Sequence, residues 1–529
     1  MARKFILCCA ALLGLLVPGG AAAAPKAPAA RPRLIVNIVV GSMRTEEIER
    51  YRDNFGAGGI RKLLDHGTCF TASQYDFSQT ITPVTLATLT TGAMPSTHGV
   101  IGPRWMDYSS NQVVELLGDP ESPSPEQLIA PTLSETLLHQ APESAAVTVA
   151  GDMQSAIVMS GRGGAAYWLN DRCNWATSPA YFEDLPDWVR TINYERFNRS
   201  YVATEWRTTL VSDKYHNHRH WDIVFNAGKS RASAASAPGR LTLESDYERL
   251  IYTPAGNTAI FGFAKQAIVH HKLGKDEVPD LLNICLDPSR YITEAYGPES
   301  VEAEDMYYQL DRDLEDFLTF VFAQVKNGEV VVVFTSDHGT SPSCDFGTTP
   351  VSRFNPRQFE VIVNGFLNVR YGTGNWVLAC DGQCLWLNHT LIYERGLNLA
   401  EVQNEVAIFA MQFTGISHTL AATAMRTSYF GSGYARKLQN GFYPRRSGDV
   451  VLNFVPGCIE ERERCVSASG SLYGYDTQVP LIFYGHHIGP HRTSRRVDMT
   501  AVAPTLAHLA GISAPAASEG EVLDEIADL

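Results

Sequence analysis

Residues 329–340 read EVVVVFTSDHGT, in which a strand-like apolar run ends in a polar turn. An apolar run without alternation is typical of a strand buried on both faces of a sheet. Asp337 and His338 follow directly after this run, at the carboxyl end of the predicted strand. Ligands bind beyond the carboxyl ends of strands in open α/β sheets, so this turn is a candidate functional site.

Similar apolar runs alternate with helical patterns along the rest of the chain. We expect further strands at residues 34–40, 145–150, 279–286 and 479–484. We expect helices at residues 45–66 with a break near 56–59, and at 82–91, 301–326 and 499–510. This alternation predicts an α/β fold with a doubly wound, mostly parallel sheet and helices on both faces.

Two stretches interrupt the alternation and are expected to be inserted cap regions. They lie at about 167–250 and 355–455, inside an α/β domain that we expect to span 34–523. The first stretch is rich in tryptophan. We favour packing within the cap for these tryptophans over a surface that stacks on a ligand.

The N-terminus carries the pattern of an export signal. Arg3 and Lys4 precede an apolar segment that ends near Pro18 and is followed by small residues. A segment this short is typical of a secretory signal peptide and not of a transmembrane helix. We expect a signal peptide over 1–24, a tether over 25–33, and an exported protein, periplasmic or extracellular, without a transmembrane anchor.

Composition excludes several classes of function. The 529 residues are 45% hydrophobic and 19% charged, which excludes a disordered chain. The formal net charge of −14 argues against nucleic acid as a partner. Eight cysteines lie beyond the signal segment, and an oxidising compartment would permit disulfides. Cys380 with Cys384 and Cys458 with Cys465 could each close a small loop, whereas Cys285 could equally be a buried thiol.

A second candidate segment lies at residues 79–104, which read QTITPVTLATLTTGAMPSTHGVIGPR. Threonine is a good N-cap and proline favours the first turn of a helix, so Thr82 and Pro83 predict a helix N-terminus. Such an end is a ready site for an anion. From these residues alone, a capping role for Thr82 is favoured over a nucleophilic one. We expect His98 to be structural, and the His-rich run YHNHRHW at 215–221 to be a solvated loop and not a metal site.

Together these segments resemble the alkaline phosphatase superfamily. The motifs TPVTLATLTTGAMPSTHGVIG, TSDHG, GYDTQVPLIFYG and VDMTAVAPTLAHLAGI stand in the family's order, within a resemblance that runs from about 34 to 522. Within that superfamily the chain most resembles the branch of exported, monomeric phosphatases with a Thr nucleophile. This branch is related to nucleotide pyrophosphatase/phosphodiesterases. The resemblance implies two zinc ions, held by three Asp and three His, that activate the threonine and stabilise the leaving oxygen.

Carried over residue by residue, the resemblance leaves this zinc site incomplete. Thr82 occupies the nucleophile position, and Asp337 and His338 keep two ligand positions. The other four ligand positions hold Gly41, Arg290, Glu294 and Gln478. Arginine is a permanent cation, glycine offers no ligand atom, and of the four only glutamate is a good zinc ligand. The positions that contact the phosphoryl group align with Pro103, Asp152 and Gln154, in place of Asn, Lys and Arg.

We therefore expect a degenerate two-zinc site and a protein that is catalytically impaired or inactive. It would need no zinc and would bind a small anion or phosphate ester at Thr82 and Arg290. We expect Arg290 to replace the metal charge by pairing with Asp337, and with Glu294. One alternative is an active phosphate mono- or diester hydrolase with altered zinc use at Asp337, His338 and Glu294. Another is a protein-interaction module that acts through the cap.

Overall fold

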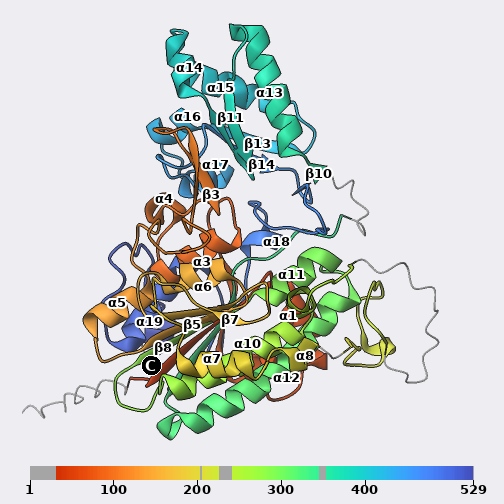
Figure 1. Ribbon diagram of the computed structural model, residues 1–529, viewed down its shortest axis with the longest axis vertical. Coiled ribbons are helices and arrows are strands. Elements are labelled where there is room, and N and C mark those ends of the chain that lie inside the picture. The colour runs from red at the N-terminus through yellow and green to blue at the C-terminus, as the bar shows by residue number, and fades with distance from the viewer. Residues whose placement is uncertain (1–30, 203–204, 226–240, 345–352, 528–529) are drawn as a thin grey trace, which may run out of the picture. The chain divides into compact units, whose positions relative to one another are not determined.

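The computed structural model describes residues 31–202, 205–225, 241–344 and 353–527 (Figure 1). The expected signal peptide and most of the expected tether lie outside the described residues. In the described part of the chain, no helix is long and apolar enough to cross a membrane.

A large, mostly parallel sheet forms the centre of the α/β domain. Among the described residues its nine strands have the order β17 (His491–Asp498), β2 (Thr68–Gln74), β16 (Leu481–Gly485), β9 (Val330–Ser336), β1 (Leu34–Val40), β8 (Asp280–Leu286), β5 (Ala146–Ala150), β6 (Ala165–Leu169) and β7 (Trp175–Ala176). Strands β9, β1, β8, β5 and β6 are parallel, and β16 is antiparallel to both of its neighbours. The predicted fold class is confirmed.

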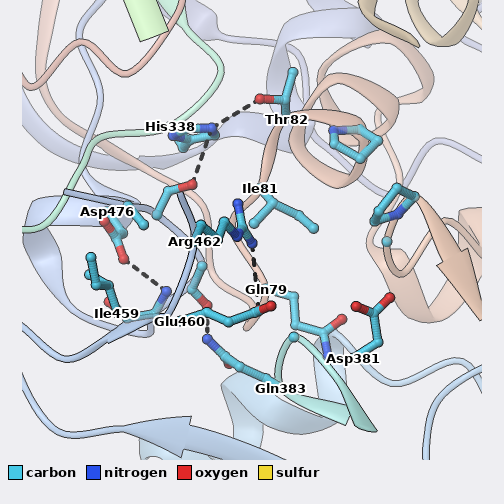
Figure 2. Close-up of a pocket in the computed structure, with 18 of the residues that line it drawn as sticks. Gln79, Ile81, Thr82, His338, Asp381, Gln383, Ile459, Glu460, Arg462 and Asp476 are labelled. Atoms are coloured by element: carbon cyan, nitrogen blue, oxygen red, sulfur yellow. Dashed lines mark hydrogen bonds and ion pairs between the residues drawn. The ribbon is translucent and has the colours of Figure 1, made fainter. Parts of the chain in front are cut away.

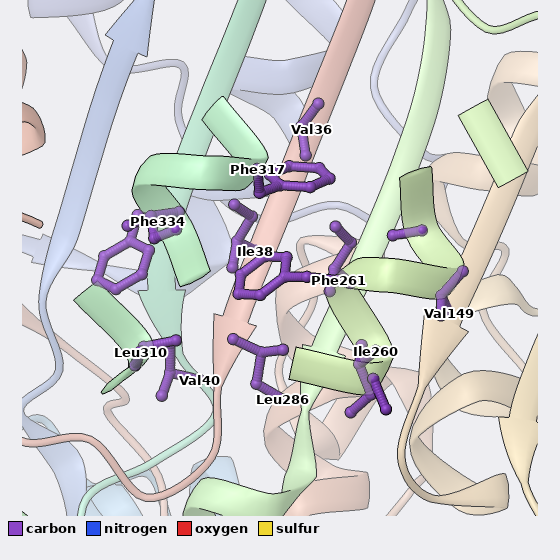
Figure 3. Packing of buried hydrophobic residues seen from close by; sticks show 14 of the residues in the cluster. Val36, Ile38, Val40, Val149, Ile260, Phe261, Leu286, Leu310, Phe317 and Phe334 are labelled. Carbon is purple, nitrogen blue, oxygen red and sulfur yellow. The ribbon is translucent and has the colours of Figure 1, made fainter. Parts of the chain in front are cut away.

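Helices cover both faces of this sheet. Side chains of a strand alternate between the two faces, so each face presents apolar side chains that need a covering layer. Val36, Ile38 and Val40 of β1 pack in one cluster with α10 (Ala255–His270) and α12 (Val301–Gln324), as Figure 3 shows. Ile35 and Val39 belong to the opposite cluster. That second cluster includes residues of α3 (Thr82–Thr91), α5 (Leu133–Gln140), α6 (Met153–Ser160) and α19 (Val502–Ala510).

Most predicted elements appear at the expected residues. The predicted helix at 45–66 is broken as expected, into α1 (Thr45–Tyr51), η1 (Arg52–Asn54) and α2 (Ile60–His66). The predicted helix at 499–510 begins as a 3₁₀ turn, η4 (Met499–Ala501), before α19.

A second sheet lies within the later insertion and has its own core. Its order is β11 (Val377–Asp381), β12 (Cys384–Leu387), β14 (Val450–Phe454) and β13 (Ile416–Ala421). It packs with α13 (Pro356–Tyr371) and α15 (Leu399–Ala410) around the buried side chains of Phe359, Trp376 and Val406. This region is therefore a small α/β unit with an apolar core.

The Trp-rich insertion packs on the α10 and α12 side of the main sheet. The rings of Trp175 and Phe263 stack with centroids 3.9 Å apart. Buried carboxylates of α12 hold the His-rich segment: Glu302 accepts the N–H groups of residues 221–223, and Glu304 those of residues 216 and 217. The segment is a loop with His216 and His218 exposed, as predicted, and the carboxylates of α12 anchor its backbone.

His98 connects two buried segments and is structural. Its Nε2 lies 3.0 Å from the Thr88 hydroxyl, and its Nδ1 accepts the N–H of Val100 at 3.1 Å. The ring is 1% exposed. Burial, with a smaller contribution from the Arg446 guanidinium, lowers the pKa of His98 to about 3.

This depressed pKa predicts a loss of stability in mild acid. The folded state keeps His98 neutral while the unfolded chain takes up a proton below about pH 6.5, so His98 destabilises the fold as the pH falls. Between pH 7 and pH 5 this residue should account for about 2 kcal/mol of the free energy of unfolding. Urea unfolding at both pH values should show a smaller pH dependence for His98→Asn than for the wild type. Equal pH dependence in the two proteins would contradict the assignment.

Candidate active site

Thr82 is the first residue of α3, and its hydroxyl points to the carboxyl end of β9. Thr82 Oγ1 lies 2.9 Å from Asp337 Oδ2. It also lies 3.1 Å from His338 Nε2, a contact drawn in Figure 2. The helix N-terminus was predicted correctly, but the capping role was wrong. Thr82 is already the first residue of the helix, so the N-cap residue is Ile81. Ile81 makes no side-chain capping hydrogen bond. The hydroxyl therefore faces the site and not its own backbone.

Asp337 and His338 lie in the buried turn after β9 and are tied to its backbone. Asp337 Oδ1 accepts the N–H of Ser42 at 2.9 Å and that of His338 at 2.7 Å. His338 Nδ1 lies 2.7 Å from the carbonyl of Gly339, to which it donates, so Nε2 faces Thr82 and Ser469. These bonds give both residues a structural role without a metal ion.

Gly41 and Arg290 are in contact, and this contact fills the position of one expected ligand. A Cβ atom on Gly41 would lie 2.7 Å from the Cβ of Arg290 and 2.9 Å from its backbone nitrogen. Arg290 belongs to α11 (Asp287–Tyr296). Because the backbone of α11 is itself this close, an aspartate at position 41 does not fit unless the helix moves.

The Arg290 guanidinium is paired with three carboxylates. It lies 3.3 Å from Asp152 Oδ2, 3.8 Å from Asp287 Oδ1 and 3.8 Å from Glu294 Oε2. The expected pairing with Glu294 is present, but among the described residues no ion pair joins Arg290 to Asp337. The Asp337 oxygens instead accept hydrogen bonds from backbone N–H groups and from the Thr82 hydroxyl. The prediction of an Arg290–Asp337 pair was therefore wrong.

The remaining positions do not complete a zinc site. Gln478 is exposed at the C-cap of α18 (Gly474–Thr477) and does not line the pocket. In the described part of the chain, no group of three or more His, Cys, Asp or Glu is arranged to hold a metal ion. The side chains that are present therefore do not fit the two-zinc centre that the sequence resemblance implies.

The pocket above Thr82 is lined by both the main domain and the later insertion. Thr82, His338 and Arg290 line one end. Figure 2 shows Gln79, Asp381, Gln383 and Glu460 grouped away from Thr82 and His338. No described residue of 167–250 lines this pocket, so the Trp-rich insertion is not its wall. Sequence reasoning missed Asp381, Glu460 and Arg462, because nothing in the pattern at 355–465 marks which side chains face a pocket.

Neither of the two possible cysteine pairs, Cys380 with Cys384 and Cys458 with Cys465, forms a disulfide in the described part of the chain. Cys380 and Cys384 are thiols, and the Sγ of Cys384 accepts a hydrogen bond from Gln79 Nε2 at 2.9 Å. Burial raises the pKa of Cys384 to about 11, so the group stays a thiol at neutral pH. The Cys465 thiol donates to the carbonyl of Ser467 at 2.8 Å.

Comparisons with known proteins agree with this architecture. Residues 35–457 match the family model described as type I phosphodiesterase / nucleotide pyrophosphatase. Alkaline phosphatase PafA of Elizabethkingia meningoseptica is 27% identical, with 97% of this chain and 98% of that protein covered. Alkaline phosphatase PhoV of Synechococcus elongatus is 25% identical, with coverage of 94% and 93%.

Solved structures give the same result. The crystal structure of wild-type PafA matches with a TM-score of 0.85 and 25% identity, covering 94% of this chain and 99% of that one. A murine ectonucleotide pyrophosphatase / phosphodiesterase 5, solved in complex with AMP, matches with a TM-score of 0.53 and 12% identity. The match covers 94% of this chain and 99% of that one, and at this identity it bears on the fold alone.

The contact at Gly41 predicts that even a single methyl group is not tolerated there. Gly41→Ala should lower the free energy of unfolding by about 1–3 kcal/mol, because the added Cβ overlaps Arg290. Gly102→Ala is the control, because the nearest atom to its added Cβ would be 3.6 Å away. Urea unfolding measures both changes, and equal stabilities of the two variants would contradict the packing described here.

The ion pairs predict that replacing each of two arginines of the same pocket lowers the free energy of unfolding by a different amount. Arg290→Ala should lower the free energy of unfolding by about 3 kcal/mol or more, because it leaves buried carboxylates without a counterion. Arg104→Ala should cost about 1 kcal/mol or less, because the Arg104 side chain is 52% exposed in its pair with Asp381. Denaturant unfolding of both variants checks the difference, and similar costs would show that Arg290 is not the counterion.

Proposed function

The chain belongs to the type I phosphodiesterase / nucleotide pyrophosphatase family, and from this premise we propose that it has kept the family's pocket but not two-zinc hydrolysis. Its alkaline phosphatase relatives make it a protein of phosphoester-hydrolase type. The proposed function is zinc-independent binding of a small ligand in the pocket above Thr82. The protein would do this after export, in the periplasm or outside the cell.

The observation that carries this proposal is the position of Arg290. Its Cβ and backbone nitrogen fill the space beside Gly41, and its guanidinium engages Asp152, Asp287 and Glu294. A divalent ion in this place would meet a permanent positive charge, and the three carboxylates nearby are already paired with that charge. Glu294, the one replacement that could coordinate zinc, is already part of the Arg290 cluster.

The chemistry of Thr82 supports the same conclusion. A threonine hydroxyl is a weak nucleophile unless a base or a metal ion activates it. Here the hydroxyl is held by Asp337 and His338, and those two side chains also serve the buried turn after β9. In this proposal Asp337 and His338 position the turn and the Thr82 hydroxyl, and Arg290 neutralises the carboxylates around it.

One geometric feature favours an active hydrolase as the second candidate. Asp337 Oδ2 and His338 Nε2 both lie within 3.1 Å of the Thr82 hydroxyl, so two former ligands still meet at the nucleophile position. A single metal ion held there would be the minimum for altered zinc use. The interaction-module alternative finds support in α13, where Val361 and Val369 are 71% and 91% exposed.

Metal content and activity test the proposal together. A two-metal enzyme purified without chelator carries about two zinc ions per chain, and we expect less than a tenth of that amount here. Aryl phosphate mono- and diesters should give no turnover that Thr82→Ala removes. Thr319→Ala, in an exposed position of α12, is the matched control. Stoichiometric zinc, or turnover lost in Thr82→Ala and kept in Thr319→Ala, would establish the active hydrolase instead.

A further inference from the structure

The pocket has a surplus of negative charge. Its lining includes the carboxylates of Asp152, Glu294, Asp381, Glu460 and Asp476, and the guanidinium groups of Arg104, Arg290 and Arg462. Each arginine already has a carboxylate partner: Arg104 pairs with Asp381 at 2.7 Å, Arg462 with Glu460 at 3.6 Å, and Arg290 with Asp152 at 3.3 Å. Each guanidinium in the described lining is therefore paired with a carboxylate, and only the buried Nε of Arg290 has no hydrogen-bond partner among the described residues.

Glu294 is a pocket carboxylate that is compensated by charge alone, from Arg290 and, beyond ion-pair distance, from Arg462. Its nearest cation is Arg290, with 3.8 Å between Arg290 Nη1 and Glu294 Oε2, and that arginine is shared with Asp152 and Asp287. Among the described residues, no hydrogen bond is donated to the Glu294 carboxylate. Its side chain is 18% exposed and lines the pocket beside Arg290. A positively charged donor in the pocket would supply the missing partner.

Two deeply buried side chains in the same lining also lack a donor. Asp476 is 1% exposed, and its Oδ2 accepts the N–H of Ser471 at 2.8 Å while its Oδ1 has no partner in the described part of the chain. Gln383 is 6% exposed, and its Nε2 donates to the carbonyl of Gly470 at 2.6 Å. That bond fixes the orientation of the amide and leaves its Oε1 without a partner among the described residues. Unpaired buried acceptors are costly, so a pocket that contains them favours a ligand rich in donors.

The rest of the lining is apolar enough to hold a hydrocarbon group. Ile81, Ile101, Trp386, Phe454 and Ile459 all line the pocket. Small-molecule sites typically combine such an apolar wall with a few polar groups that fix the orientation of the ligand. The pocket therefore has a place for an apolar stem as well as for a charged head.

We propose that this pocket selects a ligand with a primary ammonium group on an apolar stem, and not a phosphoryl anion. The ammonium group would bind at the carboxylate of Glu294, and the stem would pack on the apolar wall. This inference rests on the proposed function, because it assigns the ligand of the zinc-free pocket. It replaces the anion expected at Thr82 and Arg290, since the Arg290 guanidinium is already shared among three carboxylates.

Three probes of equal length and different charge test the proposal: hexylammonium, 1-hexanol and hexanoate, with inorganic phosphate as a fourth. Isothermal titration of the mature chain should give a Kd for hexylammonium at least tenfold lower than for hexanoate. Hexylammonium should also raise the melting temperature, because it binds only the folded chain. Binding of hexanoate or phosphate as tightly as hexylammonium, or no binding of any probe, would overturn the inference.

Variants locate the site. Glu294→Gln keeps the shape of the side chain and should weaken hexylammonium about tenfold while leaving 1-hexanol unchanged. Asp476→Asn is a second variant of the same lining and should also weaken hexylammonium. Glu121→Gln makes the same charge change in an exposed position outside the pocket and should have no effect. An unchanged Kd in Glu294→Gln would refute the assignment. Zinc content and Thr82-dependent turnover are measured separately, so failure here is distinguishable from failure of the proposed function.

Discussion

The ion cluster around Arg290 is the interaction on which the pocket depends. Asp287 links α11 to the turn before α6, because it accepts the N–H groups of Gly151 and Asp152 and the hydroxyl of Ser155. Burial, with the nearby Asp152, raises the pKa of Asp287 to about 7, so the charge of this group is costly in place. The Arg290 guanidinium offsets that cost for Asp287, Asp152 and Glu294 together. One side chain thus joins two helix ends that would otherwise repel each other.

The residues at positions 41 and 290 depend on each other. Arg290 approaches β1 closely only because position 41 is a glycine, and the carboxylates near Arg290 are tolerated only because it is a cation. A substitution at either position would therefore disturb the contacts of the other. The scaffold is unaffected, since the strands that carry the site are buried on both faces by apolar side chains.

The parts of the structure that sequence reasoning predicted are those governed by local rules. The strand at 34–40 and the helix at 82–91 were predicted at the residues where they occur, because an apolar run defines one and Pro83 and Gly92 bound the other. The predicted pairing of Arg290 with Glu294 is present, but the pairing with Asp337 was wrong, because which other carboxylate lies nearest depends on how α11 packs against the turn before α6. Asp381 and Glu460 were missed for a similar reason. They come from short strands, one in the second sheet and one in a separate two-stranded sheet, and the direction in which each side chain faces depends on that pairing.

The hydrogen bonds between α12 and the segment at 209–223 limit how parts of this fold can be exchanged between related proteins. Glu302, Glu304 and Asp305 lie fully buried, and each accepts hydrogen bonds from N–H groups of that segment. Helix α12 and the segment at 209–223 therefore depend on each other for their hydrogen bonds. A chimera that grafted this insertion from a homologue, while keeping its own α12, would bury acids without donors or donors without acids. Any exchange of modules between relatives has to carry both pieces across together.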